Sequence, residues 1–255
     1  MPAVPATVST PRREAVGHVV SLIGHTYDPK RPLDPKLDFK TDPFVDSSSF
    51  LNSFLICDDN RFPYANLGFE REPFNDYDGA PNAYHIKTIC VVTCPMPEKA
   101  YLVPDKARAK AMRYIKKIIP DLDKTGVRPF VVRFFLTTCN ALREDAGRLA
   151  LQCDQAAEIL SSLHMPHFVW VLEVSPIAEY QKGKATAVLL LDPTAAPSAA
   201  GVIAMRVGNV VKLPKKIDAP LKPGTAPDTK EILCDSAPVA FEQFTHNLGR
   251  RHKTC

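Results

Sequence analysis

The longest runs of apolar residues in this 255-residue chain fall between residues 83 and 213. The β-branched run from His85 to Thr93 predicts a strand, and the apolar run from Arg128 to Thr137 predicts a second strand that is buried on both faces. Between them, residues 105–119 have apolar positions at helical spacing, and Pro104 suits the first turn of a helix. The pattern therefore begins as strand, helix, strand.

The next element is predicted as one long helix, because seven apolar positions repeat in alternating steps of four and three. They are Leu142, Ala146, Leu149, Cys153, Ala156, Leu160 and Leu163. Alanine and cysteine in this seam favour close packing on a sheet, although a seam of three heptads also suits a coiled-coil face.

The remaining apolar runs predict four strands, at residues 167–174, 184–191, 202–207 and 210–213. Gly208-Asn209 between the last two is typical of a two-residue hairpin turn. Residues 236–248 predict a C-terminal helix, with Ser236 as its cap. Alternation of strands and helices predicts an α/β fold, in which a mixed sheet is flanked by helices (βαβα, then strands, a β-hairpin and the C-terminal helix).

Proline separates this region from the two ends of the chain. The chain has 24 prolines and 11 glycines, and 15 of those prolines lie outside residues 83–213. We therefore expect three parts: a proline-rich extended N-terminal arm with an acidic loop (1–82), an α/β core domain (83–213), and a proline- and lysine-rich connector with the C-terminal helix (214–255). Spaced apolar side chains in the arm are candidate anchors on a partner, with a flexible tail as the alternative. They are Tyr27, Leu33, Leu37, Phe39 and Phe44.

Composition removes several classes of function. Apolar residues make up 45% of the chain, charged residues 24%, and the net charge is +4. No apolar run is long enough for a membrane span, and neither of the familiar glycine-rich phosphate motifs is present, so we expect no bound nucleotide. No cofactor and no metal set is indicated. Seven cysteines without a framework spacing favour a reducing intracellular compartment, cytoplasmic or cytoskeletal, with a mitochondrial location as the alternative.

Cys94 is the candidate for thiol chemistry. It follows the predicted strand at 85–93 and precedes Pro95 and a helix, at the edge of a sheet where ligands and nucleophiles lie. The order of elements over residues 83–191 resembles the thioredoxin-like arrangement, which would imply a redox role for Cys94. The chain departs from that family at Pro97, where the second cysteine would stand. A small apolar cysteine at the end of a strand is the structural alternative.

The predicted helix at 105–119 carries six cations and only one acid, Asp105. The cations are Lys106, Arg108, Lys110, Arg113, Lys116 and Lys117. Such a helix suits docking on an acidic protein, on RNA or on membrane headgroups, whereas a solvated helix face is the simpler interpretation. No aromatic residues alternate with the cations, as a binder of single strands would require.

Three functional hypotheses follow. The first is a non-enzymatic structural or adaptor subunit of a large intracellular assembly, either cytoskeletal or ciliary or ribonucleoprotein, which docks on other subunits through its arms and its basic helix. The second is a thioredoxin-like redox enzyme that uses Cys94. The third is an RNA-binding adaptor that uses the 105–119 helix. Glu173 within the apolar run at 167–174 is either a buried acid or a solvent-facing residue of an edge strand.

Overall fold

The computed structural model describes residues 21–57, 65–68, 104–123, 128–149, 154–196, 199, 201–214, 229–234 and 239–244. The chain divides into two compact units, one made of residues 1–26 and 52–85 and the other of residues 27–51 and 86–255. The predicted strand at 85–93 and Cys94 lie outside the described residues.

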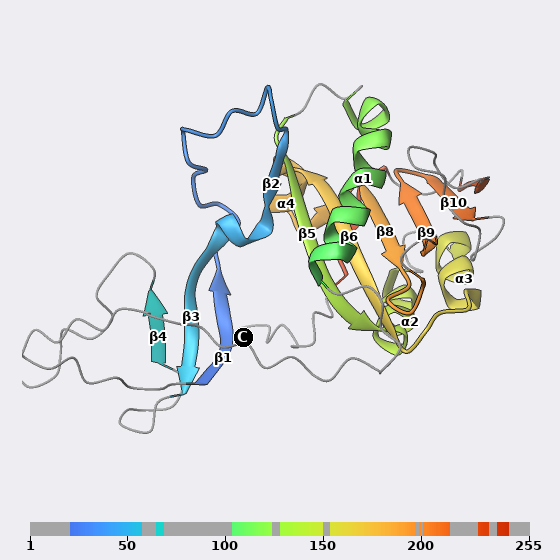
Figure 1. Ribbon diagram of the computed structural model, residues 1–255, viewed down its shortest axis with the longest axis horizontal. Coiled ribbons are helices and arrows are strands. Elements are labelled where there is room, and N and C mark those ends of the chain that lie inside the picture. Colours follow the sequence, from blue (N-terminus) through green and yellow to red (C-terminus); the bar gives the residue numbers. More distant parts are fainter. Residues whose placement is uncertain are drawn as a thin grey trace, which may run out of the picture. The chain divides into compact units, whose positions relative to one another are not determined.

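The smaller unit contains most of a three-stranded sheet with the order β1–β3–β4 (Figure 1). The strands are β1 (Ser21–Tyr27), β3 (Leu51–Cys57) and β4 (Ala65–Gly68). Strands β3 and β4 are antiparallel, and Phe54 is paired with Leu67. The hydroxyl groups of Thr26 and Ser53 share a hydrogen bond of 2.5 Å, which satisfies the buried Ser53.

The larger unit is built on a seven-stranded sheet with the order β11–β10–β9–β8–β6–β5–β2. The strands are β2 (Phe44–Asp46), β5 (Phe130–Thr138), β6 (Phe168–Pro176), β8 (Ala187–Leu191), β9 (Val202–Val207), β10 (Val210–Pro214) and β11 (Thr229–Leu233). Strand β2 is parallel to β5, and all the other neighbours in the sheet are antiparallel. The expected mixed sheet of an α/β fold is thereby confirmed.

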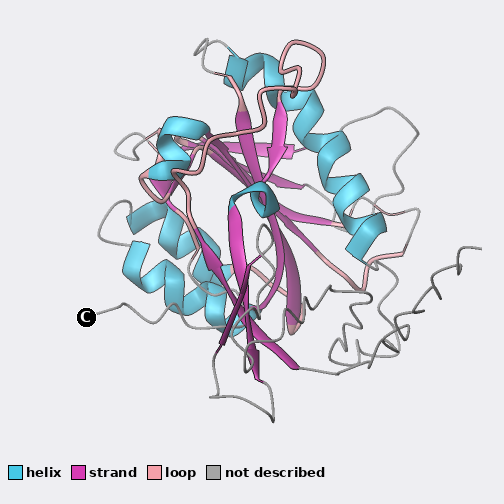
Figure 2. Ribbon diagram, turned by 90° about the vertical axis from the view of Figure 1, so that its left-hand side faces the viewer, coloured by secondary structure: helices cyan, strands magenta, loops and turns pink. Residues whose placement is uncertain are grey.

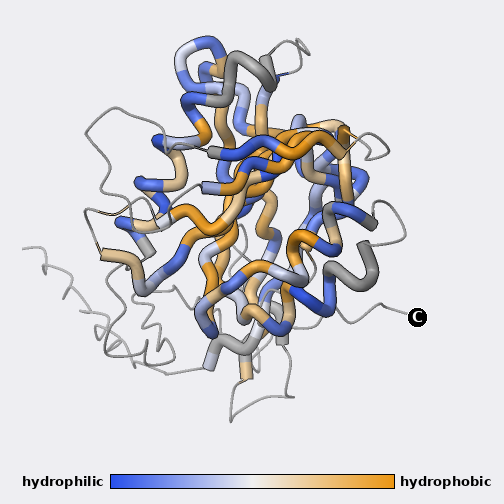
Figure 3. The backbone as a smooth tube through the Cα atoms, turned by 90° about the vertical axis from the view of Figure 1, so that its right-hand side faces the viewer, coloured by the Kyte–Doolittle hydropathy of each residue, from blue (hydrophilic) through white to orange (hydrophobic). Residues whose placement is uncertain are grey.

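Helices lie on both sides of this sheet, as Figure 2 shows, with α1 on one side and the pair α2 and α3 on the other. They are α1 (Pro104–Asp123), α2 (Cys139–Leu149), α3 (Asp154–Ser162), the short α4 (Ile177–Gln181) and a 3-10 helix (Ser47–Phe50). A separate two-stranded sheet pairs β7 (Lys184–Ala185) with β12 (Phe241–Glu242). The most hydrophobic stretches of the chain are the central strands between the helices (Figure 3).

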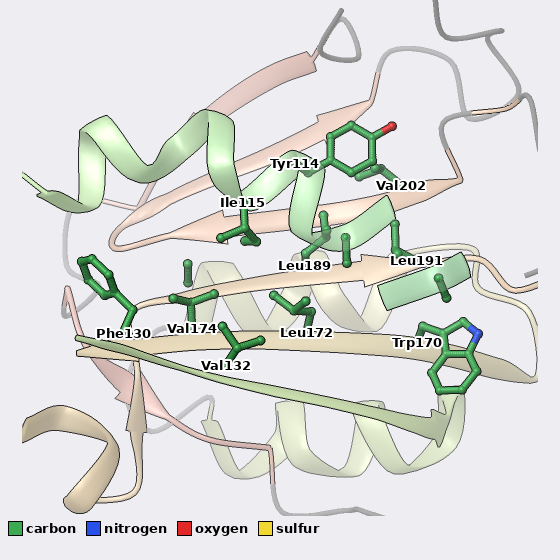
Figure 4. Close-up of a cluster of buried hydrophobic side chains, with 13 residues drawn as sticks. Tyr114, Ile115, Phe130, Val132, Trp170, Leu172, Val174, Leu189, Leu191 and Val202 are labelled. Carbon is green, nitrogen blue, oxygen red and sulfur yellow. The ribbon is translucent and has the colours of Figure 1, made fainter. Parts of the chain in front are cut away.

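Helix α1 covers its face of the sheet with small and aromatic side chains. Ala107, Ala111, Tyr114 and Ile115 are buried, and they recur at the spacing that places them on one side of a helix. They pack on an apolar cluster from β5, β6, β8 and β9 (Figure 4). The predicted helix is confirmed, although it continues beyond the predicted end at residue 119 to Asp123.

On the face of the sheet opposite to α1, the prediction of one long helix at 142–163 is wrong. The structure has two helices, α2 and α3, which pack on each other. A guanidinium nitrogen of Arg143 donates to the carbonyl oxygen of Leu163 at 3.2 Å, whereas one unbroken helix would place these residues about 30 Å apart.

The C-terminal part of the chain also differs from expectation. Residues 241–242 form a strand, so the predicted helix at 236–248 is wrong there. The spacing of Phe241 and Phe244 suits a helix, but the amides of residues 243 and 244 donate instead to the carbonyl oxygen of Gly183, in the turn before β7, and to Glu173 in β6. The predicted hairpin is confirmed, since Val207 pairs with Val210 and Gly208 has a φ of +56°.

The sheet takes strands from both sides of residues 83–213, namely β2 and β11. The loop before β2 is folded by a repeated side-chain turn, in which an aspartate accepts the amide N–H two residues further on. Asp28, Asp34 and Asp38 each do so at 2.9 Å. The domain bounds at 82 and 213 stay a prediction.

Candidate functional site

The outward side of α1 is the most strongly charged surface of the described helices. At about 100° per residue, Lys106, Arg113, Lys116 and Lys117 lie about 120–160° from the buried Ala111. All four side chains are exposed. We call these four residues the outer basic face. It extends for about 17 Å along the helix, at 1.5 Å per residue.

The other two predicted cations hold the helix to its own chain. A guanidinium nitrogen of Arg108 lies 2.7 Å from a carboxylate oxygen of Asp46 in β2. The Nζ of Lys110 donates to the carbonyl oxygen of Ala199. Burial lowers the pKa of Lys110, and the nearby charge of Arg113 adds to this. The six cations predicted as one surface therefore divide into two that anchor α1 and four that face outward.

Few groups in the described part of the chain offset the outer basic face. There, no carboxylate forms an ion pair with Lys106, Arg113 or Lys116. Ala109, which lies between the cations, is exposed and small. The acid of α1 in its first turn, Asp105, is also exposed, so the cations outnumber the acids on this surface without being alone there. A helix surface with such an excess of cations can bind an extended acidic surface.

The candidate anchors of the N-terminal segment mostly lie in the larger unit's own core. Tyr27, Leu33 and Phe39 pack around the buried residues Phe50 and Tyr180. The rings of Tyr27 and Tyr180 meet edge-on, with centroids 5.9 Å apart.

Two anchors differ from these three. Phe44 lies in β2 and packs against Phe130, with ring centroids 6.2 Å apart. Leu37 is 43% exposed, and it is the one member of the five that faces solvent. The structure thus brings four of these side chains to the chain's own fold, and only Leu37 is available for a partner without a rearrangement.

Glu173 is a buried acid, which settles the alternative that the sequence left open. Its exposed fraction is 1%, because β6 is a central strand. Its partner is Arg133, directly opposite in β5, whose Nε donates to a carboxylate oxygen at 2.6 Å. Arg133 is not among the residues predicted from the sequence, although it is a single arginine within the apolar run at 130–136 and could have been recognised by that pattern.

The thiol hypothesis stays a prediction, because Cys94 lies outside the described residues. Among the cysteines that the structure describes, Cys57 is exposed, while Cys139 and Cys234 are buried. No group of three or more potential ligands gathers among the residues that the structure describes. Within the same ranges, none of the helices combines the length and the apolar character needed to cross a membrane.

Comparisons with protein-family models, with curated proteins and with solved structures gave no significant match.

Proposed function

We propose that this protein is a non-enzymatic subunit of an intracellular assembly, of cytoskeletal or ciliary or ribonucleoprotein type, and that the outer basic face of α1 binds an acidic surface of a neighbouring protein. The observation that carries the proposal is the division of the six cations. Arg108 and Lys110 contact Asp46 and Ala199 of the same chain, and the apolar side of α1 packs on the sheet. The exposed cations of α1 that remain are Lys106, Arg113, Lys116 and Lys117, and they face outward.

An acidic protein suits this surface better than RNA does. The one aromatic residue in the described side chains of α1, Tyr114, is 7% exposed and packs on the sheet. Binding of single-stranded RNA relies on exposed aromatic rings on which bases stack. The net charge of +4 is also small for a protein that must neutralise many phosphates.

A reducing compartment is part of the proposal. Cys57 is an exposed free thiol at the end of β3, and an oxidising environment would tend to pair it. The odd number of cysteines supports the same interpretation.

The experiment compares two charge-reversed forms of the full-length chain. The first, Lys106→Glu/Arg113→Glu/Lys116→Glu, reverses three cations of the outer basic face. The control, Lys30→Glu/Lys36→Glu/Lys40→Glu, makes the same change of charge in the loop before β2. These three lysines are exposed, and their backbone amides form the aspartate turns, so the fold does not depend on their side chains.

Binding of labelled polyglutamate and of poly-uridine RNA is measured as a function of salt. We expect polyglutamate to bind the unmodified chain, and the α1 variant to bind it at least about tenfold more weakly, since three exposed pairs contribute roughly 0.5 kcal/mol each. The loop variant should stay close to the unmodified chain. Equal loss in both variants would refute a specific surface, and tighter binding of RNA than of polyglutamate would transfer the proposal to the RNA-binding alternative.

A further inference from the structure

The last described segment of the chain, Val239–Phe244, lies as a strap across the face of the sheet that α2 and α3 cover. Phe241 and Phe244 are 2% and 4% exposed, and both belong to the apolar cluster of that face. The strap pairs with β7, where Phe241 is opposite Ala185 and Glu242 is opposite Lys184. Main-chain hydrogen bonds to β7 and the packing of two aromatic side chains therefore hold the strap in place.

The buried ion pair of Arg133 and Glu173 forms hydrogen bonds with the main chain of the strap. The amide N–H of Phe244 donates to one oxygen of Glu173 at 2.7 Å, while the other oxygen accepts from Arg133. Arg133 also donates to the carbonyl oxygen of Phe244. One residue of the strap thus supplies both a donor and an acceptor to the pair, and these bonds do not depend on the identity of its side chain.

Further contacts fix the rest of the strap. The guanidinium carbon of Arg206 lies 4.0 Å from the centroid of the Phe241 ring. The amide of Gln243 donates to the carbonyl oxygen of Gly183 at 2.9 Å, and its side-chain nitrogen donates to that of Lys184 at 3.3 Å. These partners and the ion pair form what we call the strap site: Arg133, Glu173, Gly183, Lys184, Ala185 and Arg206.

We propose that the strap site is a recognition site for an extended segment with aromatic residues three positions apart, and that the strap of a second copy of this chain occupies it when subunits assemble. A second copy carries the same segment and the same site, so exchange keeps every contact described above. Exchange of an identical element is a low-cost route to a dimer, because it needs no new interface.

The connection to the rest of the chain supports exchange between copies. Only Asp235 to Pro238 separate the strap from Cys234, which is buried beside the hairpin and donates its amide to Asn209. A link of this length spans at most about 18 Å when extended. Short hinge links of this kind are places where exchange of an element between copies is readily induced. The proposal does not depend on the outer basic face.

Cross-linking between two different full-length variants tests the exchange. One variant is Lys184→Cys and the other is Glu242→Cys, since these residues are opposite each other in β7 and β12. The two are mixed in denaturant, refolded together at about 0.1–1 mM, which approaches the effective concentration of a tethered segment, and oxidised mildly. The readout is the peptide linked through positions 184 and 242, identified by mass spectrometry in the covalent dimer.

We expect this linked peptide in the mixed sample, with a yield that rises with chain concentration. A mixture of the Glu242→Cys variant with the unmodified chain gives the background from the natural cysteines. Adding Phe244→Ala to the Glu242→Cys variant should reduce the yield at least about tenfold, because it removes a buried aromatic anchor.

The double variant Lys184→Cys/Glu242→Cys shows whether the strap has the described register. If it forms the link only within one chain while the mixture gives none above background at any concentration, the strap is a fixed part of each subunit and the proposal is wrong. If the double variant forms no link at all, the strap site itself is refuted.

Discussion

The two faces of the seven-stranded sheet differ in the elements that cover them and in the polarity of their buried side chains. Toward α1, the described core is apolar, and one helix closes it (Figure 4). The other face carries the ion pair of Arg133 and Glu173, and two helices and the strap cover it. Leu172 and Glu173 are consecutive in β6 and point to opposite faces. A single strand can therefore support an apolar core on one side and a charged, hydrogen-bonded centre on the other.

The largest effect should come from breaking the charged centre. The substitution Glu173→Ala leaves the charge of Arg133 and the amide of Phe244 without their partner. Removing one member of a buried ion pair typically costs about 3–5 kcal/mol, so we expect a loss of that size in the free energy of unfolding. Urea denaturation of the full-length chain measures it. A loss below about 1 kcal/mol would show that the pair contributes little to this face.

The double variant Arg133→Met/Glu173→Leu is the matched control. It removes both charges, and only the main-chain groups of Phe244 then lack partners. It should therefore be more stable than Glu173→Ala alone, by about 1–3 kcal/mol. Additive losses would mean that the two side chains act independently.

A somewhat smaller effect is expected on the apolar face. Leu172→Ala removes a side chain with no measurable exposure from the cluster under α1. The expected loss is about 3 kcal/mol, from lost burial and the cavity that remains. Because the partners of Leu172 are apolar, this loss should not change with salt, and the same denaturation series at two salt concentrations measures that. A loss near zero would show that the cluster closes around the smaller side chain.

The difference between the faces also explains how far the sequence could predict the structure. Apolar runs identified β5, β6 and β8–β10, and the helical spacing identified α1, because burial of these elements leaves a local pattern of apolar residues in the sequence. The sequence predicts the strap as a helix, because the spacing of Phe241 and Phe244 places both side chains on one face of a helix. Only the distant partners Glu173 and Gly183 decide the matter, and no local pattern contains them.

The candidate site shows the same limit. All the cations of α1 are visible in the sequence, but the separation of Arg108 and Lys110 from the outer basic face is not. That division depends on Asp46 and on the carbonyl group of Ala199, which are 62 and 89 residues away along the chain. The spacing of residues on a helix predicts which of them share a face. Their ion-pair and hydrogen-bond partners depend on the tertiary fold.

The smallest effect concerns Tyr114, the titratable residue among the buried side chains of the apolar face. Burial raises the pKa of Tyr114 from 10.0 to about 12, because the phenolate is poorly solvated against the sheet. The unfolded chain loses this proton near pH 10, so the stabilisation is complete below that pH and is lost as the pH rises toward 12. We expect the stability difference between the unmodified chain and Tyr114→Phe to shift by on the order of 2 kcal/mol across this range. Urea denaturation of both proteins at several alkaline pH values measures the shift. Parallel curves would show that this face tolerates a charge beside Tyr114, and the contrast between the two faces would then lose its electrostatic basis.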